Sequence, residues 1–242
     1  MLHVLSKEFS SFLNSLIAYV VIGVFLLGMG LLMWVFPDTS VMEYGYADMD
    51  TLFSLGPYVF IFLVPAITMR SFAEEKKSGT MELLFTKPLS DWDIIMGKFL
   101  ASLLLVLFAL IPTLVYYYSI YSLGNPTGNL DTPGIIGSYI GLSMLAGSFC
   151  AVGIFASCIT PNQIVAFVVA AFLCFLLFSG FESISGMPFW SADGLLLKQL
   201  GMLFHYESIS RGLIDTRDVI YFFSVIFLML SITKLILGSR QW

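Results

Sequence analysis

Six long runs of apolar residues constrain this chain more than any other feature of its sequence. They cover about residues 16–36, 51–69, 99–123, 134–159, 163–181 and 219–237, and the only charged residue inside them is Lys234. A helix needs about 20 apolar residues to cross the roughly 30 Å hydrocarbon core of a bilayer. Charged residues make up 11% of the chain, against about 25% in soluble domains. The sequence therefore predicts an all-α integral membrane protein with six transmembrane helices in one domain, residues 1–242.

The charges between these runs predict the side of the membrane on which each loop lies. The first loop carries acidic residues alone, namely Asp38, Glu43, Asp48 and Asp50, whereas residues 70–98 hold five of the eleven Lys and Arg residues. Because short basic loops stay in the cytoplasm, we expect residues 70–98 and both termini on the cytoplasmic side. The net charge of −5 gives no indication of nucleic-acid binding.

Two segments outside the six runs are predicted to lie along or partly within the membrane. Residues 3–14 can form an amphipathic helix typical of the membrane interface, with Glu8 as the exception to its polarity pattern, and a frayed N-terminus is the alternative. Its apolar side consists of Val4, Leu5, Phe9, Phe12 and Leu13. Residues 182–217 are partly apolar, but Lys198 and His205 bracket too short a stretch to cross the bilayer. We therefore expect a re-entrant external segment before the sixth span.

The basic segment 70–98 contains a pattern suited to contact with a soluble partner. Gly79 and Pro88 bracket a short predicted helix in which Met81, Leu84 and Phe85 repeat at i, i+3 and i+4, so one side of that helix is apolar. A simple solvated loop is the alternative interpretation. At the end of the segment, Ser90 and Asp93 have capping-box spacing and predict the start of the next helix.

Two more residue groups are candidates for a role. The dense polar cluster outside consists of His205, Glu207, Arg211, Asp215, Arg217 and Asp218. Its i, i+4 spacing predicts a row of helix ion pairs, and an external gate or partner site is the alternative. In the fourth run, Gly137, Gly141 and Gly147 permit close helix approach, either within the chain or between two copies. Between the fourth and fifth runs, Thr160 and Pro161 predict a tight turn with Thr160 as helix N-cap.

The patterns of enzyme and ion-carrier chemistry are missing from the sequence. It has no phosphate-binding loop, no metal-ligand spacing and no ionisable residue near the centre of an apolar run. Cys150, Cys158 and Cys174 lie inside apolar runs and imply no disulfide framework. We therefore expect a chain that is not itself an enzyme and binds no cofactor or metal.

Taken in order, these elements resemble the permeases of ABC-2 type transporters. The likeness rests on residues 75–90, which are similar to the E-x-x-x-G-T-x-E-x-L-x-x-x-P stretch of that family. The resemblance implies a coupling helix that docks on a separate ATPase subunit, which would bind the ATP and Mg. The docking residues that it implies are Glu75, Gly79, Thr80, Met81, Glu82, Leu84, Phe85 and Pro88.

Within that family, residues 160–166 and 208–218 look most like the gliding-motility-associated (GldF-type) permeases of Bacteroidetes-type bacteria. This resemblance implies a bacterial inner-membrane complex with a GldA-like ATPase, a GldG-like auxiliary protein and a second permease copy or relative. Permeases of copper-enzyme maturation systems resemble the same two stretches. Alternatives from other classes are a membrane scaffold that recruits a cytoplasmic protein and a stand-alone channel or carrier.

Overall fold

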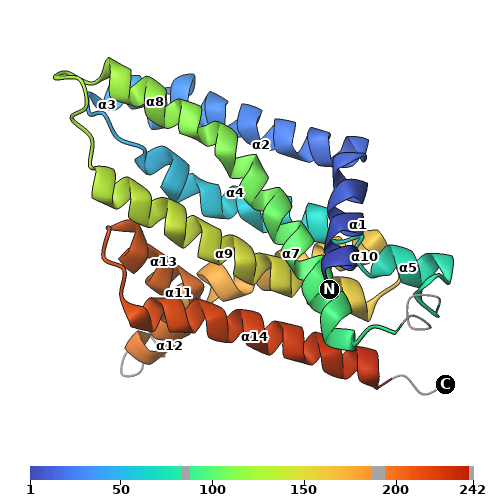
Figure 1. Cartoon of the computed structure of the whole chain (residues 1–242). Helices are drawn as coiled ribbons and strands as arrows, with labels where there is room; N and C mark the ends of the chain where they lie inside the picture. Colours follow the sequence, from blue (N-terminus) through green and yellow to red (C-terminus); the bar gives the residue numbers. More distant parts are fainter. Residues whose placement is uncertain (83–87, 187–193, 240–242) are drawn as a thin grey trace.

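The computed structural model describes residues 1–82, 88–186 and 194–239, and every regular element in these ranges is a helix (Figure 1). The predicted all-α fold class is therefore confirmed. The first half contains α1 (Leu2–Leu13), α2 (Leu16–Trp34), the 3₁₀ turn η1 (Pro37–Thr39), α3 (Val41–Tyr44), α4 (Asp50–Thr68) and α5 (Ala73–Ser78). The second half contains α7 (Asp91–Leu110), the 3₁₀ turn η2 (Ile111–Thr113), α8 (Leu114–Leu123), α9 (Thr132–Ile159), α10 (Gln163–Phe175), the π-helical turn η3 (Leu176–Gly180), α11 (Phe181–Ser185), α12 (Gly194–Leu200), α13 (Met202–Ser210) and α14 (Thr216–Gly238).

Five helical stretches in the described residues are long and apolar enough to cross a membrane. They are Asp50–Ser78, Asp91–Leu123, Thr132–Ile159, Gln163–Ser185 and Thr216–Gly238. A sixth span is obtained when α1 and α2, bent by 66° relative to each other, are counted as one broken span. The bend agrees with the predicted division into an interfacial helix followed by a first crossing.

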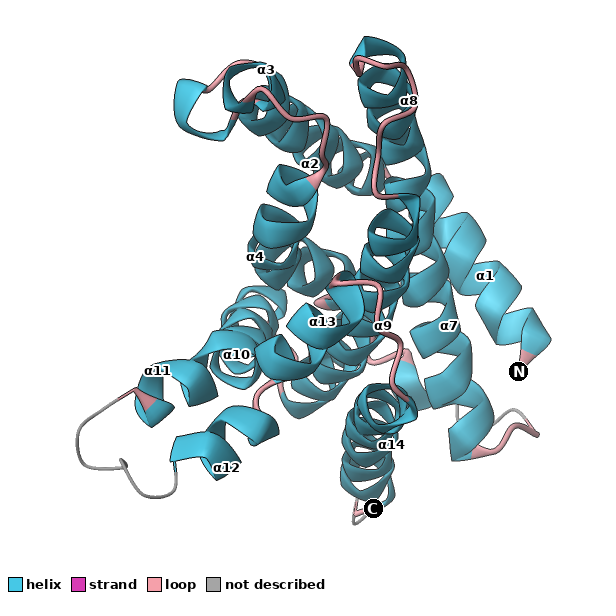
Figure 2. Ribbon diagram, turned by 90° about the vertical axis from the view of Figure 1, so that its left-hand side faces the viewer, coloured by secondary structure: helices cyan, strands magenta, loops and turns pink. Residues whose placement is uncertain are grey.

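The central element of the bundle is α9, which packs against α4, α7, α10, α13 and α14 (Figure 2). Most of its length is buried, and its glycines, alanines and serines keep its surface narrow enough for these neighbours. In lipid, small residues of this kind are what allow helices to approach closely, because there is no hydrophobic driving force between helices. The core of the protein is therefore built around α9.

The two ends of the bundle differ in charge. One end holds α1 and α5 and carries Lys7, Arg70, Lys76, Lys77 and Lys98; we call it the basic end (right side of Figure 1). At the opposite end lie α3, α12 and α13 (Figure 1). The positive-inside rule predicts that the basic end is cytoplasmic.

Three helix boundaries differ from the sequence prediction. The third span begins at Asp91 rather than at about residue 99, because the capping box starts the helix before its apolar part, and the span is broken at Pro112 by η2. The fifth span continues through η3 to Ser185. The N-cap of α10 is Asn162, whose side chain accepts the N–H of Ile164 at 3.0 Å, so the prediction of Thr160 as N-cap was wrong.

The segment predicted to be re-entrant contains α11, α12 and α13, with residues 187–193 outside the described ranges. Glu182 and Lys198 join α11 to α12 through an ion pair of 2.8 Å. The α13 helix packs on α9, and its buried Tyr206 hydroxyl donates to the Phe53 carbonyl at 2.6 Å. At this end, α13 is thus packed against α9 and bonded to α4. A re-entrant course of the segment through the bilayer stays a prediction.

Candidate functional site at the basic end of the bundle

The short helix α5 is fixed at its N-terminus by the end of α9. The Ser157 hydroxyl accepts the N–H groups of Phe72 and Ala73 at 2.8 and 3.0 Å. The same hydroxyl donates to the Met69 carbonyl at 3.1 Å. A hydroxyl offers one hydrogen and two lone pairs, so all of its hydrogen-bonding capacity is used here. The first N–H groups of a helix have no partner within that helix, and the Ser157 hydroxyl, which belongs to another span, accepts two of them here.

The C-terminus of α5 ends in a left-handed turn. Gly79 has a φ of +68°, and the N–H of Thr80 returns to the Glu75 carbonyl at 3.1 Å. Glycine adopts this conformation without the steric cost that a side chain would bring. The Lys76 amino group also donates to the Cys158 carbonyl at the end of α9. Both ends of α5 are therefore held, and the chain leaves it in a fixed direction toward the predicted coupling helix.

A buried lysine joins α5 to two other helices. Lys98, on α7, is 2% exposed, and its amino group lies 3.1 Å from Glu8 Oε1 on α1 and 2.9 Å from Glu75 Oε1 on α5. It also donates to the Ser71 carbonyl at 2.7 Å and lies 5.1 Å from the centroid of the Phe72 ring. All three ammonium hydrogens therefore have an oxygen acceptor. We call Lys98, Glu8 and Glu75 the lysine cluster.

An exposed lysine at the edge of the lysine cluster balances the net negative charge of the cluster. Two carboxylates surround one buried ammonium group, and the exposed Lys7 adds a second positive charge at 3.6 Å from Glu8 and 4.0 Å from Glu75. The Glu75 Oε2 atom is buried and has no hydrogen-bond partner among the described residues. Removing one member of such a buried ionic group leaves the others charged and unpaired, which is costly. The lysine cluster therefore fixes the relative positions of α1, α5 and α7.

The structure divides the residues predicted to dock on an ATPase. Glu75 is in the lysine cluster, and Met81 is only 5% exposed because it packs into the core of this chain. Both side chains thus contact other parts of this chain, and their predicted role in docking on a partner stays a prediction. The exposed members are Gly79, Thr80, Glu82 and Pro88. Leu84 and Phe85 lie outside the described residues, so their role stays a prediction.

The start of α7 has the predicted capping box. The Ser90 hydroxyl accepts the N–H of Asp93 at 3.2 Å, and Asp93 Oδ2 accepts the Ser90 N–H at 3.3 Å. This prediction is confirmed, and it places the first turns of α7 beside α1, against which α7 packs.

At the opposite end, the predicted polar cluster contains one buried pair. His205 Nδ1 lies 2.6 Å from Asp218 Oδ1, and Asp218 is 5% exposed. His205 Nε2 lies 2.9 Å from the Gln199 carbonyl, and the imidazole stacks on the Tyr221 ring at 3.9 Å. The imidazole is thus held between the Asp218 carboxyl group and the Gln199 carbonyl, one on each ring nitrogen.

The rest of this polar cluster is exposed and only partly paired. Arg211 lies 3.7 Å from Glu207, which confirms the first predicted i, i+4 pair. The prediction of an Arg211–Asp215 pair was wrong among the described contacts, because α13 ends at Ser210 and Gly212 turns the chain at φ +81°. Asp215 instead caps α14 through the N–H of Arg217 at 3.0 Å, and the Arg217 side chain is exposed.

The structure favours a stabilising role for the His205–Asp218 pair. Replacing His205 by leucine leaves a buried carboxyl group without its partner, and we expect a loss of about 1–3 kcal/mol in the free energy of unfolding. Thermal unfolding of the purified protein in detergent measures this loss. Arg211→Leu is the matched control, because its ion pair is exposed and such pairs are worth at most about 1 kcal/mol. Equal unfolding temperatures for the two variants would contradict the expectation.

The three candidate glycines of α9 all face other helices of the same chain. A β-carbon at Gly137 would lie 2.6 Å from the Ile209 carbonyl oxygen, and one at Gly141 would lie 3.2 Å from Ile209 Cγ2. A β-carbon at Gly147 would lie 3.2 Å from Ile226 Cδ1 on α14. Of the two predicted roles, packing within the chain accounts for these positions.

Sequence reasoning missed the residues that hold the basic end together. Ser157 gives no signal in the sequence, and Lys98 was predicted only as a marker of the cytoplasmic side. The one available signal was Glu8, the acidic exception on the apolar side of the N-terminal helix. A carboxylate in that position indicates a cationic partner elsewhere in the chain, and the structure identifies it as Lys98.

Comparison with known proteins gives a consistent result. The sequence profile of the family described as "ABC-2 family transporter protein" matches residues 2–189. The protein named "Probable multidrug ABC transporter permease YbhR" from Escherichia coli strain K12 is 27% identical over 153 residues, which cover 61% of this chain and 39% of YbhR. The YbhR protein of Escherichia coli O157:H7 gives the same values. The chain thus matches well under half the length of these curated relatives.

Proposed function

This chain belongs to the ABC-2 family of transporter proteins, and from that premise we propose that it is a permease subunit driven by a separate ATPase. Its partner would dock on residues 80–88, at the basic end. The observation that carries this proposal is the anchoring of α5, which leads directly into that segment. Ser157, Lys76 and the lysine cluster tie α5 to α9, α7 and α1, so a displacement of the docked segment reaches three other helices.

The orientation follows from the same proposal. An ATPase that uses cellular ATP docks in the cytoplasm, and the basic end is the cytoplasmic one by the positive-inside rule. The N-terminus and the end of α14 would then both lie on the cytoplasmic side of a bacterial inner membrane. A second permease, identical or related, would complete the membrane part of the complex.

The cargo class is suggested by the named relatives and by the character of the helices. YbhR carries a multidrug description, so export of apolar or amphipathic compounds is the first candidate. Lys98 and Asp218 are buried but lie in the first turns of α7 and α14, away from the middle of the spans. Transport of free ions usually needs ionisable groups near the middle of spans. Transmission of motion to an external partner is the alternative output.

The finer assignment to the gliding-motility system rests on motif resemblance alone. Residues 160–166 and 208–218 favour a GldF-like subunit with GldA-like and GldG-like partners, and a copper-enzyme maturation permease shares those stretches. The multidrug description of YbhR favours a drug-type exporter instead. Mass spectrometry of the complex, gently solubilised from its native membrane, separates these assignments by the partners retained.

A single substitution tests the docking proposal. Leu84→Asp would place a charge in the proposed apolar contact, where it would be desolvated without a partner. We expect loss of the co-purifying ATPase and of vanadate-sensitive ATP hydrolysis, while the permease still inserts into the membrane. Lys77→Asp is the matched control, because Lys77 is exposed on α5 and outside the proposed contact. Retention of an active ATPase by the Leu84→Asp complex would show that the docking assignment is wrong.

A further inference from the structure

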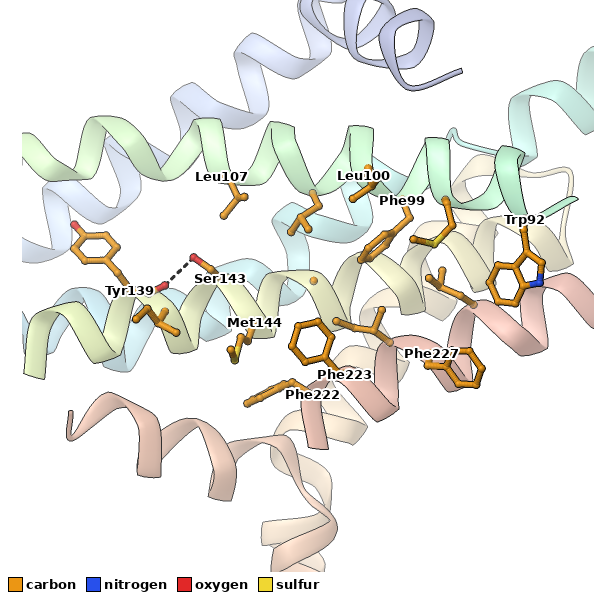
Figure 3. A pocket seen from close by; sticks show the side chains of 16 residues that line it. Trp92, Phe99, Leu100, Leu107, Tyr139, Ser143, Met144, Phe222, Phe223 and Phe227 are labelled. Carbon is orange, nitrogen blue, oxygen red and sulfur yellow. Dashed lines mark hydrogen bonds between the residues drawn. The ribbon is translucent and has the colours of Figure 1, made fainter. Parts of the chain in front are cut away.

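An apolar groove runs along the bundle between α7, α9 and α14. Its volume is about 670 Å³, within the range of roughly 300–1,000 Å³ typical of ligand sites. Each of the three helices contacts the other two. Figure 3 shows Leu100 and Leu107 on one side, Met144 on the floor, and Phe223 and Phe227 on the other side. Phe223 and Phe227 are 61% and 67% exposed, so the groove opens to the surroundings of the bundle.

The described hydroxyl groups that line the groove already make hydrogen bonds within the chain. The Ser143 hydroxyl donates to the Tyr139 carbonyl at 2.7 Å, and the Tyr139 hydroxyl is bonded to Thr113 at 2.9 Å. Gly147 contributes no side chain, which leaves the floor open. The groove therefore suits a largely apolar ligand, because a polar one would be desolvated with little compensation.

One end of the groove has a cationic and aromatic boundary. Trp92 lies at the end toward the basic end of the bundle and stacks on Phe227, with ring centroids 6.3 Å apart (Figure 3). The Lys234 amino group lies 5.2 Å from the centroid of the Trp92 ring. Among the described residues, no carboxylate forms an ion pair with Lys234, and Asp93 beside Trp92 is engaged by Ser90. Tryptophan and lysine at this position are typical of the headgroup level of a bilayer.

We propose that this groove binds one acyl chain of an anionic phospholipid, with the lipid phosphate beside Lys234. The groove follows α7 from Trp92 to Leu107, which is about 22 Å at 1.5 Å per residue. This length exceeds the roughly 15 Å of one leaflet of the hydrocarbon core, so an acyl chain can lie in the groove along its whole length. The second acyl chain stays in the bilayer.

The charge at one end of the groove favours a phospholipid over a helix from another subunit. The single positive charge at one end matches a phosphate, whereas a transmembrane helix needs no such charge.

The test uses the complete chain in bilayer discs of phosphatidylcholine that contain a trace of a photoreactive lipid. The lipid carries a diazirine in one acyl chain and has either a phosphatidylglycerol or a phosphatidylcholine headgroup. Crosslinked peptides are identified by mass spectrometry. We expect labels concentrated on groove residues of α7, α9 and α14, with phosphatidylglycerol favoured about fivefold, because one Lys near the headgroups contributes about that factor.

Four variants make the test specific. Leu103→Trp fills the groove and should abolish groove labelling, whereas Leu104→Trp, on the neighbouring exposed position outside the groove, should not. Met144→Trp fills the groove from α9 and replaces Leu103→Trp if that variant fails to fold. Lys234→Gln should remove the preference for phosphatidylglycerol and leave phosphatidylcholine labelling unchanged.

Several results would overturn the proposal. Labels spread evenly over the exposed faces of α2 and α10 as well would indicate surrounding bilayer lipid only. If the groove residues stay unlabelled and crosslinks join two copies of the chain at the groove, the groove is a subunit interface. A lipid preference that survives in Lys234→Gln would exclude the phosphate contact. None of these measurements requires an ATPase, so they remain informative whether or not the proposed coupling is correct.

Discussion

Lys98→Met is expected to lower the free energy of unfolding by about 3–5 kcal/mol. Methionine keeps most of the volume of the lysine stem but removes the ammonium group, which leaves Glu8 and Glu75 charged and facing each other at the basic end. We expect a lower yield of monodisperse protein and a lower unfolding temperature in detergent. In the proposed complex, ATP hydrolysis should also become independent of the permease, because α5 is no longer tied to α7.

Two comparisons separate this effect from the general loss of a positive charge. Lys77→Met removes a charge from an exposed position of α5 and should leave stability unchanged. Adding Glu8→Gln and Glu75→Gln to Lys98→Met removes the uncompensated charges and should restore much of the stability, because apolar or neutral replacement of a complete buried ionic group is often tolerated. If the triple variant is no more stable than Lys98→Met, the lysine cluster does not act as one electrostatic unit.

Gly153→Val should destabilise the protein at or above the about 3 kcal/mol upper end of typical overpacking costs. A β-carbon at Gly153 would lie 1.9 Å from Thr68 Oγ1 and 2.8 Å from Thr68 Cβ. The Thr68 hydroxyl could rotate, but its Cβ is fixed to the backbone of α4, so α4 and α9 would have to separate. Because Ser157 lies one turn beyond Gly153 and Met69 directly follows Thr68, the anchoring of α5 should weaken together with the core.

The matched control is Gly28→Val on α2. No atom outside its local backbone lies within 4 Å of a β-carbon built at Gly28, so the same substitution meets open space there. Thermal unfolding of both variants in one detergent compares them directly. Similar unfolding temperatures would mean that α4 and α9 are not in close contact at Gly153.

Local patterns in the sequence predicted the parts of this fold that depend on neighbouring residues. The apolar runs predicted the spans, because bilayer thickness fixes their length independently of how they pack. The capping box at Ser90 and Asp93 was predicted, because both of its hydrogen bonds lie within one helical turn. The cap at Asn162 was misassigned by two residues, because Thr160 and Pro161 form an equally plausible start and only the backbone conformation decides between them.

The parts that depend on distant residues were not predicted. Glu8 and Lys98 are 90 positions apart, and Phe72 and Ser157 are 85 positions apart. Neither pair has a spacing rule that sequence reasoning could use, because their proximity is set by the packing of α1, α7 and α9. The burial of Met81 has the same origin: its helical spacing indicated one apolar side but not whether that side faces a partner or the chain itself.

The third span has a further mechanical consequence. From Asp91 to Leu123 it comprises 33 residues, about 50 Å of helix, which is far more than the roughly 30 Å needed to cross the bilayer. The excess length lets the helix tilt or project beyond the hydrocarbon core. Lys98 lies in its first turns, and the 3₁₀ turn at Ile111–Thr113 interrupts the α-helix in its second half. In the orientation proposed above, such a helix would act as a lever whose first turns lie toward the cytoplasm. A small lateral displacement of these first turns would tilt the helix. The 3₁₀ turn at Pro112 would then determine how much of that tilt is transmitted to the far side of the membrane.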